Sequence, residues 1–304
     1  MLFANRIRLQ LPSIRLTSKR FSAIAFTGRS TCSFLLVVFL LLITLPGLAQ
    51  QKAATPKAGI KYGSNPAAGQ YITARGIKHY VEIYGKGKPL LLLHGNGGSI
   101  EAFYKTIPYF EKQYQVIAVD SRAHGKSIDS GDSLSFDMMA DDCIALLDHL
   151  KIDSAYVIGW SDGGITALIL ALRYPNRIRK IAATGANIFV DNTVFTDNGY
   201  LGMVAEYARK KDKPYSNAVE KNKWKLFLLD FLYPTLTIQD MQKINRPSLI
   251  IAGDKDAITL EHTLLIYKHI PHAQLWILPN SGHATLLEHP RLFNQQVDRF
   301  FQSN

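Results

Sequence analysis

Cysteine is almost absent from the sequence: the 304 residues contain only Cys32 and Cys143. Cys32 precedes an apolar run near the N-terminus, so removal of that region would leave Cys143 alone. A disulfide framework or a cysteine-based metal site is then excluded. The histidines and acids show no clustered metal-ligand spacing either. The sequence therefore predicts neither a metal nor another cofactor.

Repeats and nucleic-acid-binding motifs are also lacking. No period of 20–50 residues recurs, which argues against a repeat architecture. The net charge of +11 is the one feature that suggests a nucleic-acid partner. Six of the 35 basic residues stand among residues 1–49, where no acid occurs, so the remaining 29 face 24 acids. We therefore expect no nucleic-acid partner.

The first 49 residues have the pattern of a targeting segment. A basic region precedes the unbroken apolar run FLLVVFLLLI at residues 34–43, and small residues follow at Gly47 and Ala49. This order predicts a signal peptide at residues 1–49, cleaved before Gln50, and export to the periplasm or the medium. The apolar run is shorter than the roughly 20 residues that cross a bilayer as a helix. Because the basic region is long for a signal, an uncleaved membrane anchor is the alternative, and only then would a membrane be a partner.

Residues 50–69 are rich in Ala, Gly, Pro and Lys and lack a core pattern, which predicts a linker. The folded domain is expected over residues 70–304. There, short apolar runs typical of strands covered on both faces alternate with helical patterns. The predicted strands are 78–84, 90–93, 116–119, 156–158, 181–183, 249–252 and 275–278, and the predicted helices are 136–150, 164–174, 260–269 and 290–301.

This alternation predicts the α/β class, with a mostly parallel sheet and helices on both faces. The first hairpin-like pair, near residues 78–84, would form the antiparallel edge. Residues 188–245 break the alternation with aromatic and basic helical stretches. We interpret them as a small helical cap inserted over the carboxyl edge of the sheet.

Polar residues follow five of the predicted strands. Ligands of open α/β sheets bind outside the carboxyl ends of the strands, so these positions are candidates for a site. A serine, an acid and a histidine occur there in that order along the chain. The segments are His94-Gly95-Asn96, Asp120-Ser121-Arg122-Ala123-His124, Gly159-Trp160-Ser161-Asp162-Gly163, Gly253-Asp254-Lys255-Asp256 and Ser281-Gly282-His283.

On these segments the sequence resembles the α/β-hydrolase superfamily, of the AB hydrolase-1 serine hydrolase type, over about residues 70–304 except the cap. The resemblance implies the α/β-hydrolase fold, with a mostly parallel eight-stranded sheet and a small helical cap. Residues 159–163 match the Gly-x-Ser-x-Gly nucleophile elbow, a sharp turn from strand to helix that lifts the serine hydroxyl clear of the sheet. Such a match is weak alone, because Ser161 could simply cap the following helix. The matching segments at the other strand ends favour a nucleophile.

The resemblance implies a catalytic triad. Ser161 would be the nucleophile and His283 its general base, and Asp256 would orient the imidazole. Asp254 is the rival for the acid, but the second Asp of the family's Gly-Asp-x-Asp pattern is the usual choice. The order Ser161, Asp256, His283 is also the chain order of the family.

The resemblance also implies an oxyanion hole, built from the backbone N–H groups of Asn96 and Asp162. The segment from Gly159 onward further resembles the valacyclovir hydrolase, or biphenyl hydrolase-like, group. In that group the acid beside the serine is associated with a substrate's α-amino group. Asp162 and Trp160 are therefore candidate substrate-binding residues. A carboxylate at a helix N-terminus is favourable in any case, so Asp162 could instead contribute only its N–H.

These features predict a serine hydrolase that cleaves a small ester or related acyl substrate. The serine at the elbow excludes haloalkane dehalogenases and epoxide hydrolases of this fold, which use an aspartate there. Proline-iminopeptidase-like, aminoacyl-ester and carbon–carbon bond hydrolases share the triad and remain alternatives. A ligand-binding protein on the same fold is the alternative outside enzymes. Nothing in the sequence indicates an oligomeric state.

Overall fold

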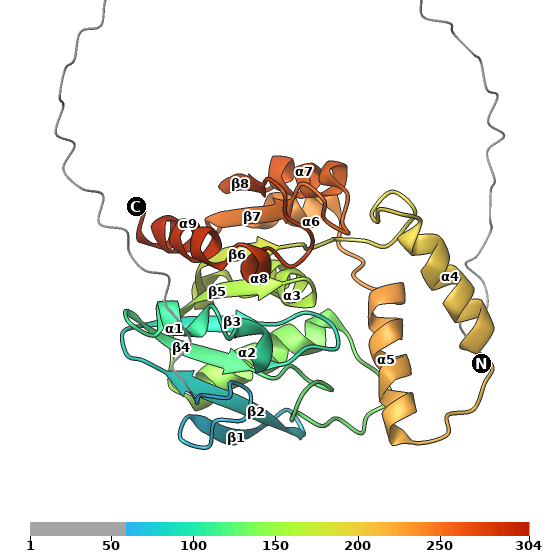
Figure 1. The fold of residues 1–304 in the computed structure, drawn as a ribbon, viewed down its shortest axis with the longest axis horizontal. Helices are drawn as coiled ribbons and strands as arrows, with labels where there is room; N and C mark the ends of the chain where they lie inside the picture. Colours follow the sequence, from blue (N-terminus) through green and yellow to red (C-terminus); the bar gives the residue numbers. More distant parts are fainter. Residues whose placement is uncertain (1–58, 304) are drawn as a thin grey trace, which may run out of the picture. The chain divides into compact units, whose positions relative to one another are not determined.

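Strands and helices alternate through residues 59–303, the part of the chain that the computed structural model describes. The strands form one eight-stranded sheet in the order β1-β2-β4-β3-β5-β6-β7-β8 (Figure 1). The α/β class and the mostly parallel sheet predicted from the sequence are confirmed. The strands are β1 (Gly69–Ala74), β2 (Ile77–Tyr84), β3 (Lys88–Leu93), β4 (Tyr114–Val119), β5 (Ala155–Trp160), β6 (Ile178–Thr184), β7 (Ser248–Gly253) and β8 (Ala273–Leu278).

The sheet is parallel from β4 to β8 and antiparallel at the edge formed by β1 and β2. Strand β3 pairs with β4 on one side and with β5 on the other. The chain order therefore reverses at β3, and Leu93 lies directly opposite Gly159 of β5. Such a reversal opens a crevice at the carboxyl ends of the two strands, which is where ligands bind in this kind of sheet.

Helices cover both faces of the sheet. The helices are α1 (Ile107–Phe110), α2 (Phe136–His149), α3 (Asp162–Arg173), α4 (Gly199–Lys210), α5 (Ala218–Leu232), α6 (Ile238–Lys243), α7 (Leu260–His269), α8 (Thr285–Glu288) and α9 (Pro290–Gln302), with short 3₁₀ turns at Ile100–Phe103 and Pro175–Arg177.

Two hydrophobic cores result because alternate residues of a strand face opposite sides. Leu91 and Leu93 pack with buried residues of α2, α3, α6 and α7. Leu90 and Leu92 pack on the other face with α1 and α9, including Phe293. The continuous apolar runs that predicted these strands therefore reflect burial on both sides.

Three helices, α4, α5 and α6, stand between β6 and β7, within residues 188–245, where a cap is expected from the sequence. Helix α5 buries Trp224, Leu226 and Leu229, whereas α4 buries none of its side chains. Figure 1 shows α4 and α5 at the end of the sheet toward which the arrowheads of the parallel strands point. The cap thus lies on the side where the candidate residues follow their strands.

The folded domain begins earlier than predicted. Residues 60–68 were expected to belong to a linker, but Tyr62 is buried against the sheet. The buried carboxylate of Glu82 accepts hydrogen bonds from the backbone N–H groups of Gly63 and Asn65, both at 2.8 Å. The linker prediction failed here because these contacts come from β2 and leave no hydrophobic pattern in residues 60–68 themselves.

The predicted targeting segment, residues 1–49, lies outside the described residues. Among the helices of residues 59–303, none is long and apolar enough to cross a bilayer.

Candidate active site

Ser161 stands at the turn between β5 and α3, with backbone angles φ 56° and ψ −116°. This left-handed conformation is strained for a residue with a side chain. The Ser161 side chain makes no capping hydrogen bond to α3, so the alternative that it serves as a helix cap is not supported. The glycines of the motif are a steric requirement, because a Cβ at Gly163 would collide with the carbonyl oxygen of Leu93 and one at Gly159 with that of Gly163.

The structure brings Ser161, His283 and Asp256 together from three different strand ends. The Nε2 of His283 lies 3.0 Å from the Oγ of Ser161, and its Nδ1 lies 2.6 Å from Oδ1 of Asp256. An ionised carboxylate can only accept, so the network places the ring proton on Nδ1. The lone pair of Nε2 then faces the hydroxyl group of Ser161. This is the arrangement in which a histidine can take a proton from a serine.

Asp256, and not Asp254, is the acid that contacts the imidazole. The side chain of Asp256 is fully buried and also accepts from the backbone N–H of Ile258 at 3.1 Å. Asp254 is exposed, and its Oδ1 accepts from the backbone N–H of Ser281 at 3.0 Å. Asp254 therefore shapes the loop that leads to His283 without touching its ring.

Trp160, at the end of β5, and Gly185, just after β6, lie against His283. The indole Nε1–H of Trp160 donates to the backbone carbonyl oxygen of His283 at 2.9 Å. Gly185, after β6, has a φ of +63°, and a Cβ there would stand only 2.7 Å from Cε1 of His283. Trp160, a candidate substrate-binding residue in the sequence, is thus placed where it supports the histidine.

The turn after β3 passes very close to the elbow. A Cβ at Gly95 would lie 3.0 Å from the Cβ of Ser161, so a larger residue would crowd the nucleophile. Asn96 follows, and its side-chain Nδ2 donates to the carbonyl oxygen of Leu226 in α5 at 3.1 Å. Asp162 opens α3, where the first N–H groups of a helix lack intrahelical partners. Asp162 thus directly follows Ser161, and Asn96 directly follows the glycine that lies against it.

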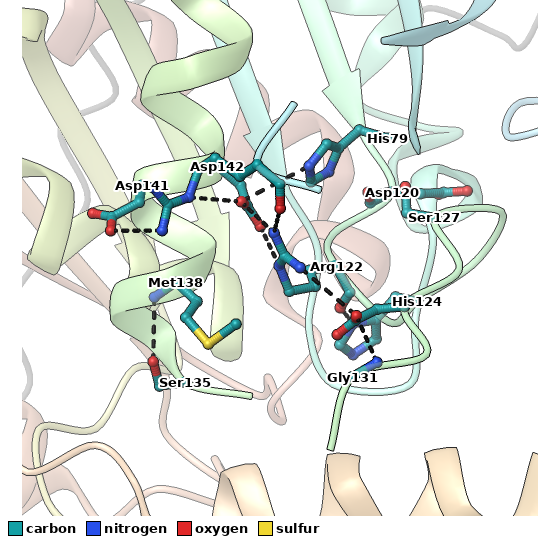
Figure 2. Close-up of polar contacts among 12 residues, drawn as sticks. His79, Asp120, Arg122, His124, Ser127, Gly131, Ser135, Met138, Asp141 and Asp142 are labelled. Carbon is teal, nitrogen blue, oxygen red and sulfur yellow. Dashed lines mark hydrogen bonds and ion pairs between the residues drawn. The ribbon is translucent and has the colours of Figure 1, made fainter. Parts of the chain in front are cut away.

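The loop after β4 is hydrogen-bonded to the turn after β3. Its Ser121 N–H donates to Nε2 of the fully buried His94 at 3.1 Å. Burial lowers the pKa of His94 to about 3, so its ring is neutral and structural. In the same loop, Arg122 donates to both carboxylate oxygens of Asp142 in α2 at 2.7 and 2.8 Å (Figure 2). The loop is thereby fixed to the sheet and to α2.

A buried ion pair fastens the cap to the same loop. The Nζ of Lys225, in α5, lies 3.1 Å from Oδ2 of Asp129, and both side chains are more than 90% buried. Asn222 of α5 donates to the carbonyl oxygen of Ala123 at 2.9 Å. Helix α5 is therefore attached to the sheet domain through polar contacts along one face.

Asp230, near the end of α5, is a site residue that the sequence did not indicate. Its carboxyl group hydrogen-bonds with Asp162 and Asn96 beside the elbow. The signal that could have pointed to it is an acid within the otherwise apolar run Leu226–Leu232. Burial, followed by repulsion from Asp230, raises the pKa of Asp162 well above its usual range. Burial likewise raises the pKa of Asp230 to about 6.

Aromatic residues of the cap stack on one another, as Trp224 does on Phe227 with ring centroids 4.8 Å apart. Beside this stack lies a groove of about 740 Å³ lined by residues 206–227, including Tyr215, Arg209 and Lys223. The groove belongs to the cap alone, so these aromatic residues form cap packing and its outer surface. Within residues 59–303, no group of three His, Cys, Asp or Glu side chains is arranged to hold a metal ion.

The chain is similar to several known proteins. The model of the alpha/beta hydrolase fold family matches residues 88–221 and 189–290. The human serine hydrolase BPHL is 28% identical over 268 residues, covering 81% of this chain and 91% of that protein. The 2-hydroxymuconate semialdehyde hydrolase of Pseudomonas sp. (strain CF600) is 28% identical over 268 residues, covering 78% and 95%. A solved hydrolase structure from Pseudomonas aeruginosa PA01 has a TM-score of 0.68 at 21% identity, covering 79% of this chain and all of that one.

Proposed function

Because this chain belongs to the alpha/beta hydrolase fold family, we propose that it is a serine hydrolase that cleaves a small ester or related acyl substrate. The observation that carries the proposal is the hydrogen-bonded chain Ser161–His283–Asp256, with distances of 3.0 and 2.6 Å. It begins at a strained elbow and ends at a fully buried carboxylate. A strained backbone at a crevice is more readily explained by catalysis than by stability.

In the first half of the proposed reaction, Ser161 Oγ attacks the substrate carbonyl carbon while its proton passes to Nε2 of His283. The backbone N–H groups of Asp162 and Asn96 stabilise the negative charge that develops on the carbonyl oxygen. The tetrahedral intermediate collapses when the bond to the leaving alcohol breaks. That alcohol receives the proton from His283, and an acyl-enzyme on Ser161 remains.

In the second half, His283 takes a proton from water as the water oxygen attacks the acyl carbon. The same N–H groups hold the second oxyanion. The bond to Oγ then breaks, and His283 returns its proton to Ser161. The acid product leaves and the enzyme is restored. Asp256 stabilises the imidazolium in both halves without itself becoming protonated.

A hydrolysis screen tests the proposal. p-Nitrophenyl esters of increasing acyl length are compared with aminoacyl esters and proline arylamides, and Ser161→Ala is the control. We expect turnover of at least one ester series that Ser161→Ala abolishes, together with labelling of Ser161 by a fluorophosphonate probe. A folded protein that shows neither turnover nor labelling would favour the alternative of a ligand-binding protein on this fold.

Aminoacyl esters are a more specific candidate substrate class. The observation in favour is the carboxyl group of Asp162, only 3% exposed and next to the nucleophile, where it could pair with an ammonium group. On this view Asp162→Ala lowers activity on aminoacyl esters far more than on simple acyl esters. An equal loss on both classes would remove this assignment.

A carbon–carbon bond hydrolase is the second candidate. The supporting observation is the similarity to 2-hydroxymuconate semialdehyde hydrolase over 78% of this chain. Including 2-hydroxymuconate semialdehyde in the hydrolysis screen distinguishes the carbon–carbon bond hydrolase from the ester hydrolase. Preference for it over every ester, measured as kcat/KM, would replace the ester assignment while leaving the role of Ser161 intact.

We further propose that the hydrolase acts after export, on the basis of the basic and apolar pattern of residues 1–49. N-terminal sequencing of the protein isolated from the cell envelope or the medium should read from Gln50. A first residue within the targeting segment would favour the membrane-anchored alternative.

A further inference from the structure

The carboxyl groups of Asp162 and Asp230 lie together beside the elbow, and no basic side chain of residues 59–303 neutralises them there. Asp162 belongs to α3 and Asp230 to the cap helix α5, yet their side chains are hydrogen-bonded to each other. Asp162 is 3% exposed, and its Oδ2 has no hydrogen-bonding partner among the described residues. The proposed triad uses neither carboxyl group.

A hydrogen bond between two carboxyl groups requires a proton, because ionised carboxylates can only accept. Two buried negative charges in contact would repel each other strongly in a medium of low dielectric constant, so such pairs retain one proton between them. The third member of the cluster, Asn96, supplies amide N–H groups. One donates to the carbonyl oxygen of Leu226 at 3.1 Å, and the amide also contacts both acids.

We propose that Asp230 is a positioning residue: it shares one proton with Asp162, and this acid pair holds Asn96 and helix α5 against the elbow. Asn96 is then fixed at both ends, by its backbone after β3 and by its side chain under the cap. The direction of its backbone N–H, on which the oxyanion hole depends, is therefore set partly by a residue of the cap. The positioning role rests on the proposed function, whereas the shared proton does not.

The titration of the pair agrees with this arrangement. Burial raises the pKa of both acids, and the hydrogen bonds that Asp230 receives from Asp162 and Asn96 moderate its rise to about 6. His283 faces Asp230 from the loop after β8 and also lowers its pKa. Lys225, one helical turn and a half earlier in α5, is engaged with Asp129. Both shifts favour a state in which the pair retains a proton.

Infrared spectroscopy of the full chain at pH 7 tests the shared proton directly. The carbonyl stretch of a protonated carboxylic acid should be present in the wild type and in Ser161→Ala. It should disappear in Asp162→Asn and shift in Asp230→Asn, where an amide replaces the partner. Asp212→Asn, which removes an exposed cap carboxylate, is the matched control and should change nothing. Absence of the band in the wild type, its persistence in Asp162→Asn, or an unshifted band in Asp230→Asn would each overturn the proposal.

Ester kinetics test the positioning role. Asp230→Leu leaves Asn96 and Asp162 without this partner, so we expect kcat to fall about tenfold while KM changes little, which corresponds to the loss of a hydrogen bond to a charged group. Asp230→Asn keeps a polar partner and should recover part of the loss. Equal kcat in the wild type and in folded Asp230→Leu would overturn the role. If no variant, including the wild type, shows Ser161-dependent turnover, the proposed function fails while the infrared result still decides the shared proton.

Discussion

The indole N–H of Trp160 donates to the backbone carbonyl oxygen of His283 at 2.9 Å, joining the end of β5 to the loop after β8. The residue just before the proposed nucleophile therefore holds the residue that would activate it. One side of the elbow would position the proposed base, and the other side, Asp162, would contribute to the proposed oxyanion hole. This division of roles leads to the first prediction.

Trp160→Phe keeps an aromatic side chain and removes the N–H donor. Because a hydrogen bond of this kind contributes about 1 kcal/mol, we expect kcat to fall about fivefold with little change in KM. Steady-state kinetics on the preferred ester measure this fall in kcat. Trp276→Phe, in the edge strand β8, is the control and should leave kcat unchanged. A normal kcat in Trp160→Phe would show that the loop holds His283 without this bond.

Asp256→Asn should lower kcat by about 10³- to 10⁴-fold, because an amide no longer stabilises the imidazolium or fixes the tautomer. The matched control is Asp254→Asn, two residues away. Its amide oxygen can still accept from the N–H of Ser281, so kcat should stay within about twofold of the wild type. Similar losses in both variants would contradict the assignment of Asp256 as the acid.

Gly185→Ala should lower kcat about 100-fold, because the new methyl group would push the His283 ring away from Ser161 and small misplacements of catalytic groups are costly. The positive φ of 63° adds a stability cost of about 1 kcal/mol. Gly76→Ala separates the two effects, since its φ is +82° but no atom lies within 4 Å of the new Cβ. It should lose similar stability in urea unfolding and keep its activity.

His262 makes the fold sensitive to acid. Its Nε2 accepts from the backbone N–H of Ile188 at 3.0 Å, and burial lowers its pKa to about 4 from the ordinary 6.5. Between these values the unfolded chain binds more protons than the folded one, so the free energy of unfolding falls as the pH drops from 6.5 to 4. On the order of 2 kcal/mol should be lost between pH 7 and pH 4.5 through this group.

Urea unfolding of His262→Gln at both pH values measures this loss. The variant should be less stable than the wild type at pH 7 and should lose less stability on acidification. His272→Gln, at an exposed position, is the control and should follow the wild type. An unchanged pH dependence in His262→Gln would assign the acid sensitivity to other groups, such as His94.

The sheet and the elbow could be predicted because their signals are local. Apolar runs such as Leu90–Leu93 follow from burial on both faces, and the glycines around Ser161 follow from collisions that any side chain would cause there. The N-terminal limit of the folded domain was harder to predict from the sequence. The packing of Tyr62 and the hydrogen bonds of Glu82 depend on strand β2, which lies about twenty residues further along the chain.

The sequence by itself determined the strand ends, and with them the positions of Ser161 and His283, because a turn is formed by residues that are adjacent in the chain. Only the tertiary structure decided between Asp254 and Asp256, which differ in burial and not in composition. It alone placed Trp160 on His283 and Asp230 on Asp162, contacts that join residues 123 and 68 positions apart. Such contacts arise when the cap and loops pack on the carboxyl edge of the sheet, and no periodicity along the chain encodes them.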